Sequence, residues 1–230
     1  MKQFRTRGIV LARTDYAEAD RILTFLTPDR GKLKAYARGV RKSKSKLAGG
    51  IELFSVSDLS LIPGKREIDT VVSTRLIKHF GNIVKDFDRT DVGFGFIKKL
   101  HKATEDAPEA GYFYLLEQAF GALDDFKIDL NLIALWFDIQ LLRLSGHTPN
   151  LTTDVKGDRL SSESKYIFDF EKMHFKPDEG GTFGAEHIKF LRLGFSSNPI
   201  RILNRIKQAE NLSVQLQPVV QSMLRAHIRI

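Results

Sequence analysis

The sequence contains no cysteine, one tryptophan and three methionines among 230 residues. Without cysteine the chain can form no disulfide framework, no cysteine-ligated zinc site, no iron–sulfur cluster and no thiol nucleophile. No apolar run approaches the roughly 18 residues of a transmembrane helix. The opening residues, MKQFRTRG, also lack the apolar stretch of a signal peptide. We therefore expect a soluble protein of the cytoplasm.

Catalytic signatures are missing as well. The six histidines form no HExxH or other metal-ligand spacing, and the chain has no GxxxxGK[ST], GxGxxG or GxSxG motif. Three groups of acidic residues are candidates for the metal site of a nuclease. In proteins such groups more often cap helices or shape loops. The groups are Asp86 with Asp88, Asp124 with Asp125, and Asp15 with Glu18 and Asp20. We assign no catalytic residue and expect no cofactor.

The composition is that of a folded globular protein. Hydrophobic residues make up 42% and charged residues 28% of the chain, which is too apolar for a disordered polypeptide. The length allows one large domain or two small ones.

Positive charge is concentrated in the first third of the chain. Residues 1–80 hold 17 basic and 8 acidic side chains, whereas the remaining residues have a net charge close to zero. The net charge of the whole chain is +8. The segment from Arg30 to Lys46 contains eight basic residues and no acidic one. Such a field attracts polyanions, with nucleic acid or an anionic membrane surface as the leading candidates. The alternative is a solvated face that only aids solubility.

The first 80 residues show the alternation typical of strands. Five strands are predicted, at Phe4–Arg13, Arg21–Thr27, Lys32–Val40, Phe54–Ile62 and Asp69–Ile77. In KLKAYARGV, which begins at Lys32, basic and apolar side chains alternate, so one face should be buried and the other cationic. Tyr36 could stack on a base or be buried in the barrel. Five short strands in this length fit a small closed barrel such as the OB-fold, with an open meander as the alternative.

From about residue 81 the pattern becomes helical. Helices are predicted at Ile83–Thr104, Pro108–Phe126, Asp129–Leu144, Ala185–Phe195, Pro199–Lys207 and Leu212–Ile230, the last interrupted or kinked near Pro218. The helix at Asp129–Leu144 is apolar nearly all round, so it should be central, with Trp136 in the core. His147 should be a helix-terminal or surface residue. Residues 150–185 turn polar and suggest an irregular insertion. The fold class is thus α+β, with a barrel domain at 1–80 and a helical domain at 81–230.

Several ordered fragments together resemble one family. They are Gly8–Leu11 (GIVL), Tyr16–Arg21 (YAEADR), Leu26–Thr27 with Gly31–Lys32, Ala37–Arg41 (ARGVR), and Leu142–Leu151 (LRLSGHTPNL). In order and spacing this set resembles the RecO recombination mediators of bacterial DNA repair. The resemblance covers essentially the whole chain. It implies an N-terminal OB-fold, a helical body, and an activity that is not enzymatic.

The same resemblance implies the partners. RecO-like proteins bind single- and double-stranded DNA, anneal complementary strands, and help to load RecA onto DNA coated by single-stranded-DNA-binding protein. They work with RecR and often with RecF. A protein of this kind would be cytoplasmic and associated with the nucleoid.

The chain departs from the family in its insertion. Many members carry four zinc-ligating cysteines there, at positions that fall near Asp154, Gly157, Gly184 and His187 here. Glycine offers no side-chain ligand, and one Asp plus one His is too few for a closed structural site. We expect a finger-like skeleton, including Gly180 and Gly181, that is held without metal.

Two binding sites are predicted. The main DNA contacts are Lys32, Lys34, Arg38, Arg41, Lys42, Lys44 and Lys46, with Arg5, Arg7, Lys65 and Arg66 as secondary contacts that could instead protect a sheet edge. The resemblance also implies a site for the acidic, apolar-ended tail of single-stranded-DNA-binding protein. We place it among Phe190, Leu191, Leu193 and Phe195 with Lys189, Arg192, Arg201 and Arg205. The alternative is that these apolar residues are core.

Two other functional classes remain open as alternatives. A metal-dependent nuclease with an OB-type recognition domain would need a convergent carboxylate cluster. A peripheral membrane protein would need a basic amphipathic helix or a lipidation site, whereas the charge here lies on predicted strands and a loop.

Overall fold

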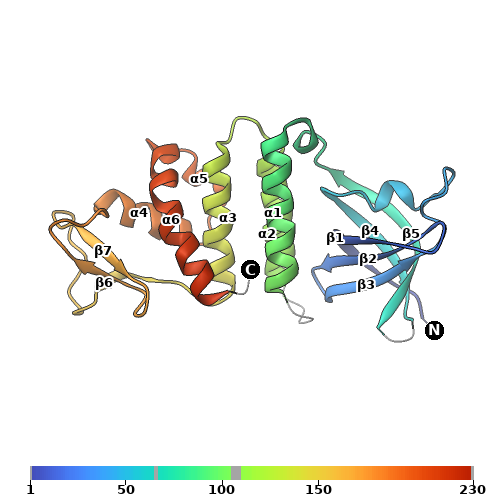
Figure 1. Cartoon of the computed structure of the whole chain (residues 1–230), viewed down its shortest axis with the longest axis horizontal. Coiled ribbons are helices and arrows are strands. Elements are labelled where there is room, and N and C mark those ends of the chain that lie inside the picture. Colours follow the sequence, from blue (N-terminus) through green and yellow to red (C-terminus); the bar gives the residue numbers. More distant parts are fainter. Residues whose placement is uncertain (1, 65–66, 105–109, 229–230) are drawn as a thin grey trace. The chain divides into compact units, whose positions relative to one another are not determined.

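A computed structural model describes residues 2–64, 67–104 and 110–228. The chain divides into two compact units, residues 1–125 and 126–230. All five N-terminal strands lie in the first unit together with two helices, α1 (Phe87–Ala103) and α2 (Ala110–Leu123) (Figure 1). The strands end at His79, so the change from strand to helix falls inside this unit.

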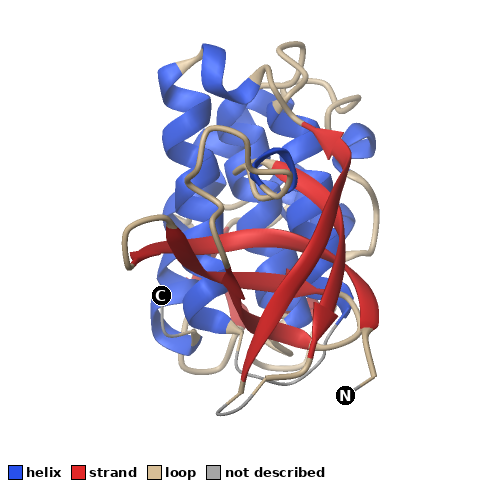
Figure 2. Ribbon diagram, turned by 90° about the vertical axis from the view of Figure 1, so that its right-hand side faces the viewer, coloured by secondary structure: helices blue, strands red, loops and turns tan. Residues whose placement is uncertain are grey.

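The five strands close into a barrel. They are β1 (Phe4–Tyr16), β2 (Asp20–Thr27), β3 (Gly31–Ala37), β4 (Ser55–Ile62) and β5 (Ile68–His79). The order around the barrel is β1-β2-β3-β5-β4, and β1 also pairs with β4. Every pairing is antiparallel except that of β3 with β5. Figure 2 shows the strands crossing one another around the barrel. This is the predicted OB-fold rather than an open meander.

Alternation along the strands fills the barrel. Inward side chains form one apolar cluster, which comprises Val10, Leu23, Phe25, Leu33, Ala35, Ala37, Val40, Ile51, Leu59, Leu61 and Val71. Because β3 contributes Leu33, Ala35 and Ala37 to the inside, the period of two places Lys32, Lys34 and Tyr36 on the outside.

Aromatic contacts hold the two helices of this unit against the barrel. The ring of Phe54 packs edge-on against Phe94 of α1 and Phe120 of α2, with both centroid distances at 5.3 Å. Gly93 makes the approach possible, since a Cβ atom there would lie 2.6 Å from Cε1 of Phe54. Asp86 caps α1 by accepting a hydrogen bond from the backbone N–H of Arg89.

The second unit is built around α3 (Leu130–Leu144), with α4 (Ala185–Phe195), α5 (Ile200–Leu203) and α6 (Ala209–His227). As predicted, α3 is buried along most of its length, and Trp136 lies in the core, where its indole N–H donates to the carbonyl of Asn198 at 3.3 Å.

The structure corrects one helix prediction in this unit and part of another. The predicted helix Pro199–Lys207 is a single turn, Ile200–Leu203. The predicted interruption at Pro218 does not occur, because α6 runs through it, whereas the predicted kink stays a prediction. Pro218 is exposed, while its neighbours Leu216, Val219 and Val220 are buried. The buried face of the helix therefore offsets the lost backbone hydrogen bond.

The insertion is more regular than expected. It contains a three-stranded sheet of order β6-β8-β7, from β6 (Asn150–Asp154), β7 (Tyr166–Asp169) and β8 (His174–Pro177). Phe175 packs edge-on against Tyr166, Phe168 and Phe183. Gly181 lies against the backbone of Tyr166, where a Cβ atom would be only 2.5 Å from the carbonyl carbon and oxygen.

Candidate nucleic-acid interface

The outer face of β3 carries a row of cations with one aromatic ring between them. Lys32 and Lys34 share this face with Tyr36, and Arg38 follows directly after the end of β3; Lys34 and Arg38 are exposed. Lys32 is half-buried, and its Nζ donates to the carbonyl of His101 at 3.1 Å. Tyr36 therefore lies outside the barrel, among the cations, which the alternation itself indicates.

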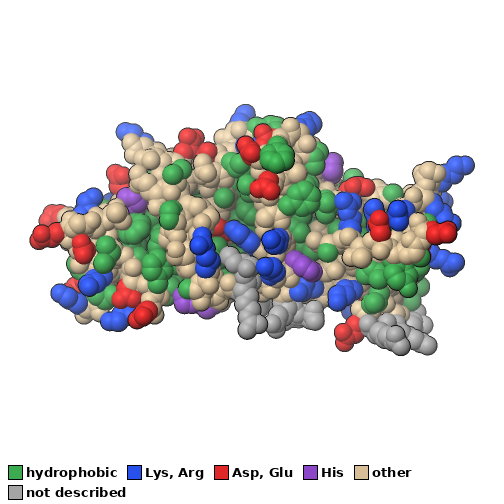
Figure 3. Space-filling model, viewed as in Figure 1, with side chains coloured by type: hydrophobic (Ala, Val, Ile, Leu, Met, Phe, Trp, Pro, Cys, Tyr) green, Lys and Arg blue, Asp and Glu red, His purple; other side chains and the backbone are tan. Residues whose placement is uncertain are grey.

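The loop after β3 continues the row. Arg41, Lys42, Lys44 and Lys46 are all exposed, and Figure 3 shows basic side chains projecting from this end of the barrel. The loop is attached to the barrel because the N–H of Arg41 donates to the carbonyl of Ala19 at 2.9 Å. Arg41 also pairs with Asp15 at 3.5 Å.

Most of these cations have no acidic partner. Among the residues that the structure describes, Lys34, Arg38, Lys42, Lys44 and Lys46 form no ion pair. An exposed cation without a local carboxylate keeps its full charge available to a polyanion.

The acidic residues of the first loop have structural roles. Asp20 accepts hydrogen bonds from the hydroxyl of Tyr36 and from the N–H of Gly39, and these two bonds lower the pKa of the Asp20 carboxyl. The same bond to Asp20 raises the pKa of Tyr36. Asp15 pairs with Arg21 at 2.8 Å, and this hydrogen bond is the main reason its pKa is lowered.

A hollow of about 790 Å³ opens on this side of the barrel. Strand residues Thr14, Thr24, Lys32 and Lys34 line it, together with Arg30, His101 and the acidic Glu67 and Asp69. Burial, followed by the charges of Lys32 and Lys34, lowers the pKa of His101. Arg30 lines this hollow but also lies over the ring of Phe4, 3.9 Å from its centroid.

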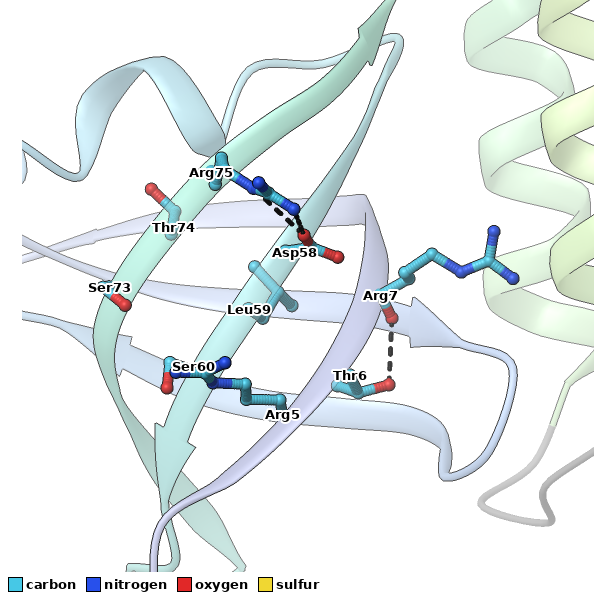
Figure 4. Close-up of a pocket in the computed structure, with 9 residues that line it drawn as sticks. All are labelled: Arg5, Thr6, Arg7, Asp58, Leu59, Ser60, Ser73, Thr74 and Arg75. Atoms are coloured by element: carbon cyan, nitrogen blue, oxygen red, sulfur yellow. Dashed lines mark hydrogen bonds and ion pairs between the residues drawn. The ribbon is translucent and has the colours of Figure 1, made fainter.

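The secondary contacts lie on another part of the barrel. A second hollow, of about 550 Å³, lies on β1, β4 and β5 between Arg5, Ser60, Ser73 and Arg75. Figure 4 shows the Arg75 guanidinium beside Asp58, which it contacts at 2.5 Å, and the Arg7 guanidinium directed away toward the helices. Arg7 is engaged by α2, whereas Arg5 is exposed. Lys65 and Arg66 lie outside the described residues.

The proposed tail-binding residues lie on α4, on α5 and in the turn after α5, but they are not equally open. Phe190, Leu191 and Phe195 are buried in the core, whereas Leu193 is 39% exposed. Arg192 is exposed, yet its Nε donates to the carbonyl of Leu151 at 2.7 Å. Lys189, Arg201 and Arg205 are exposed. An apolar pocket at this site could therefore use Leu193 but not Phe190.

The insertion residues at the family's zinc positions do not fit the metal. Asp154 is 5% exposed, and its carboxylate accepts from the N–H groups of Lys156 at 2.8 Å and Asp158 at 3.1 Å. The Nδ1 atom of His187 accepts from the N–H of Gly184 at 3.2 Å, and its Nε2 atom contacts Oε1 of Gln215 at 2.6 Å. Gly157 and Gly184 offer no side-chain ligand. The two side chains that could ligate zinc instead satisfy backbone groups.

The carboxylates considered as a nuclease metal site also accept hydrogen bonds from nearby groups. Asp86 caps α1, and Asp124 accepts from the N–H of Asn82 at 2.7 Å. Within residues 2–64, 67–104 and 110–228, no three His, Asp or Glu side chains are grouped so that they could hold a metal ion. In the same ranges no helix is long and apolar enough to cross a bilayer.

Tyr16 and Arg75 are not among the DNA contacts predicted from the sequence. Tyr16, the last residue of β1, is 53% exposed next to Tyr36. Its position directly before the loop between the first two strands was a usable signal, because that loop commonly borders the ligand face of an OB-fold. No local sequence signal places Arg75 and Arg5 around the same hollow, since β1 and β5 are joined only through their pairing with β4.

Comparison with known proteins agrees with this architecture. Residues 1–80 match the family model described as Recombination protein O N terminal, and residues 100–230 match Recombination protein O C terminal. The chain is 31% identical over 238 residues to DNA repair protein RecO of Dehalococcoides mccartyi, covering 98% of this chain and 89% of that protein. DNA repair protein RecO of Bifidobacterium longum subsp. infantis is 35% identical over 158 residues, covering 67% of this chain and 66% of its own length. The chain therefore belongs to the RecO family of DNA repair proteins.

Proposed function

We propose that this protein is a non-enzymatic recombination mediator that binds single- and double-stranded DNA and anneals complementary strands. It would help to load RecA onto DNA coated by single-stranded-DNA-binding protein, together with RecR; RecF, with which RecO-like proteins often work, is a further candidate partner. Binding to chromosomal DNA would keep it at the nucleoid in the cytoplasm. The observation that carries the proposal is the row of exposed cations on the OB-fold from Lys34 to Lys46, in which, among the residues that the structure describes, Arg41 alone forms an ion pair.

The mechanism is largely electrostatic. Lysine and arginine side chains neutralise phosphates and release the counterions condensed on DNA. Two strands bound to one cationic surface repel each other less, which speeds their pairing. Neither step needs a catalytic group. The carboxylates of Asp15 and Asp20 are engaged with Arg21, Arg41, Tyr36 and Gly39, and the other cations of the row form no ion pair among the described residues.

Charge reversal tests the DNA-binding part of the proposal. Changing Arg38, Arg41, Lys42 and Lys44 to Glu should abolish most binding to a labelled single strand in an anisotropy titration. A matched control reverses four exposed lysines elsewhere, namely Lys156, Lys172, Lys176 and Lys207, with the same change in net charge. The control should keep most of the affinity. Equal losses in both variants would show that only overall charge matters and would reject the site.

Salt dependence gives an independent measurement. For roughly five phosphates neutralised on a single strand, log K should fall against log salt concentration with a slope of about −3.5. A nearly flat dependence would contradict the electrostatic mechanism.

Annealing and cleavage are separated in one assay. Complementary labelled strands are mixed with the protein, with and without magnesium. Faster duplex formation with intact strands in both conditions is expected. Magnesium-dependent cut product would contradict the non-enzymatic assignment and favour a nuclease.

A docking site for the tail of single-stranded-DNA-binding protein forms the last part of the proposal. Such a tail presents carboxylates and a terminal apolar group. Leu193 on α4, Arg201 on α5 and Arg205 in the following turn are exposed and offer a complementary chemistry.

A further inference from the structure

We propose that the ring of Tyr16 is a stacking platform for an unpaired base, so that the barrel holds the bases of a single strand as well as its phosphates. The inference rests on the proposed DNA binding and adds to it a contact that the duplex cannot make. Tyr16 ends β1 and is 53% exposed, although aromatic side chains of this size are usually well covered.

Tyr36 holds the Tyr16 ring in place. The two ring centroids are 5.9 Å apart with an interplanar angle of 85°, which is an edge-to-face arrangement. This contact uses only part of the Tyr16 surface, and more than half of the residue stays open to solvent. A ring fixed on one side and free on another can receive a base with little loss of side-chain entropy.

The support is itself fixed by hydrogen bonds. The hydroxyl of Tyr36 donates to Asp20, and the N–H of Gly39 donates to the other carboxylate oxygen of Asp20 at 2.6 Å. Tyr16 and Asp20 are direct cross-strand partners in the β1–β2 ladder. Strand pairing and a shared carboxylate thus set the positions of both rings before any ligand arrives.

Cations lie close to the two rings, since the charge of Arg38 acts on Tyr36 as well as on Asp20. Arg38 follows β3 next to Tyr36, and the charges of Arg38 and Lys42 act on Asp20. Alternating cations and aromatic rings are the combination that binds single strands without strong sequence preference. In a duplex the bases are already paired and stacked, so the Tyr16 ring would contribute little.

Two substitutions at Tyr16 test the inference. Tyr16→Leu keeps apolar bulk but removes the aromatic face, and Tyr16→Phe keeps the face but removes the hydroxyl. Stacking of one base predicts that Tyr16→Leu lowers single-strand affinity by about 5- to 150-fold. For Tyr16→Leu, the slope of log K against log salt concentration and the affinity for duplex DNA should stay near the wild-type values. For Tyr16→Phe, the single-strand affinity should also stay near the wild-type value. The control is Phe87→Leu, which makes the same kind of change at a ring that is 85% exposed at the start of α1; it should change nothing.

A fluorescent adenine analogue in the single strand gives a direct readout. Its emission should be quenched on binding to the wild type and to Tyr16→Phe, and restored with Tyr16→Leu at saturating protein. Unchanged affinity and quenching with Tyr16→Leu would overturn the inference while the proposed DNA binding stands. Equal losses for single strand and duplex would also overturn it, because they would indicate a backbone or folding role. Failure of the wild type to bind either DNA would instead reject the proposed function.

Discussion

The guanidinium group of Arg7 donates a hydrogen bond to the hydroxyl of Tyr114 at 3.1 Å and lies over the ring of Phe113, 5.3 Å from its centroid. Arg7 belongs to β1, whereas both aromatic residues belong to α2. The contact therefore links the barrel to a helix that lies more than a hundred residues later in the chain. Arg5, two residues earlier on the same strand, remains exposed in the second hollow.

We predict that Arg7→Ala lowers the free energy of unfolding by about 1–2 kcal/mol, because it removes a cation–π contact and a hydrogen bond. Arg5→Ala, the matched variant on the same strand face, should leave it almost unchanged. Denaturant unfolding followed by far-UV circular dichroism measures both. Equal stability of the two variants would mean that the Arg7 contact contributes nothing.

Local patterns predicted the barrel and its cationic face well. The alternation in KLKAYARGV sets which side chains of β3 face outward, and that depends only on a period of two. The same period puts Arg5 and Arg7 on one face and cannot tell them apart. The difference comes from α2, and packing between elements so far apart in sequence leaves no local signal.

Helix ends and the insertion were harder to predict for a related reason. Pro218 is an unfavourable residue locally, yet the buried side chains around it keep α6 continuous. In the insertion, short polar stretches gave little periodicity. The sheet β6-β8-β7 depends on contacts of Phe175 with Tyr166 of β7 and with Phe183, which follows β8 in the chain. Tertiary contacts decided both cases.

The insertion should be stable without zinc. Purified protein treated with a chelator is expected to keep its melting temperature, and elemental analysis should find no stoichiometric metal. The physical reason is that Asp154 and His187 already bond backbone groups of their own turns. One zinc per chain, with a fall in melting temperature on its removal, would contradict this expectation.

The role of Asp154 can be measured separately. Asp154→Ala leaves the N–H groups of Lys156 and Asp158 without their acceptor, and the expected loss is about 1–3 kcal/mol of unfolding free energy. Asp154→Asn keeps one acceptor oxygen and should lose less. A loss with Asn as large as that with Ala would indicate that charge, rather than hydrogen bonding, stabilises the turn.

Acid should weaken the second unit through His147. Its ring stacks on that of His227 with centroids 4.8 Å apart, and burial, followed by the charge of His227, lowers the pKa of His147 below its ordinary 6.5. The unfolded chain then binds the proton more readily than the folded one. Stability is therefore unaffected well above pH 6.5 and falls as the pH drops through that value.

Substitution of His147 should reduce this acid sensitivity. His147→Asn is compared with His79→Asn, which alters an exposed histidine on β5, by denaturant unfolding on both sides of the ordinary histidine pKa. The difference in unfolding free energy between the two pH values should be smaller for His147→Asn than for the wild type. For His79→Asn it should equal that of the wild type. The same pH dependence in both variants would show that His147 is not responsible.

The tail of single-stranded-DNA-binding protein should lose affinity when the exposed cations of α5 and the turn after it are reversed. In Arg201→Glu with Arg205→Glu, two favourable contacts with the tail carboxylates become repulsive, so peptide affinity should fall by at least about tenfold. Leu193→Ser should also weaken binding of the tail, because Leu193 is the exposed apolar side chain of the predicted site. Phe190 is buried and therefore unsuited as a test.

The control is reversal of the charges of Lys172 and Lys176 in the insertion, which makes the same change in net charge on exposed residues. A labelled tail peptide in an anisotropy titration and a naked single strand are measured with each variant. If peptide affinity is untouched and DNA affinity falls instead, these arginines contact DNA and the docking site lies elsewhere.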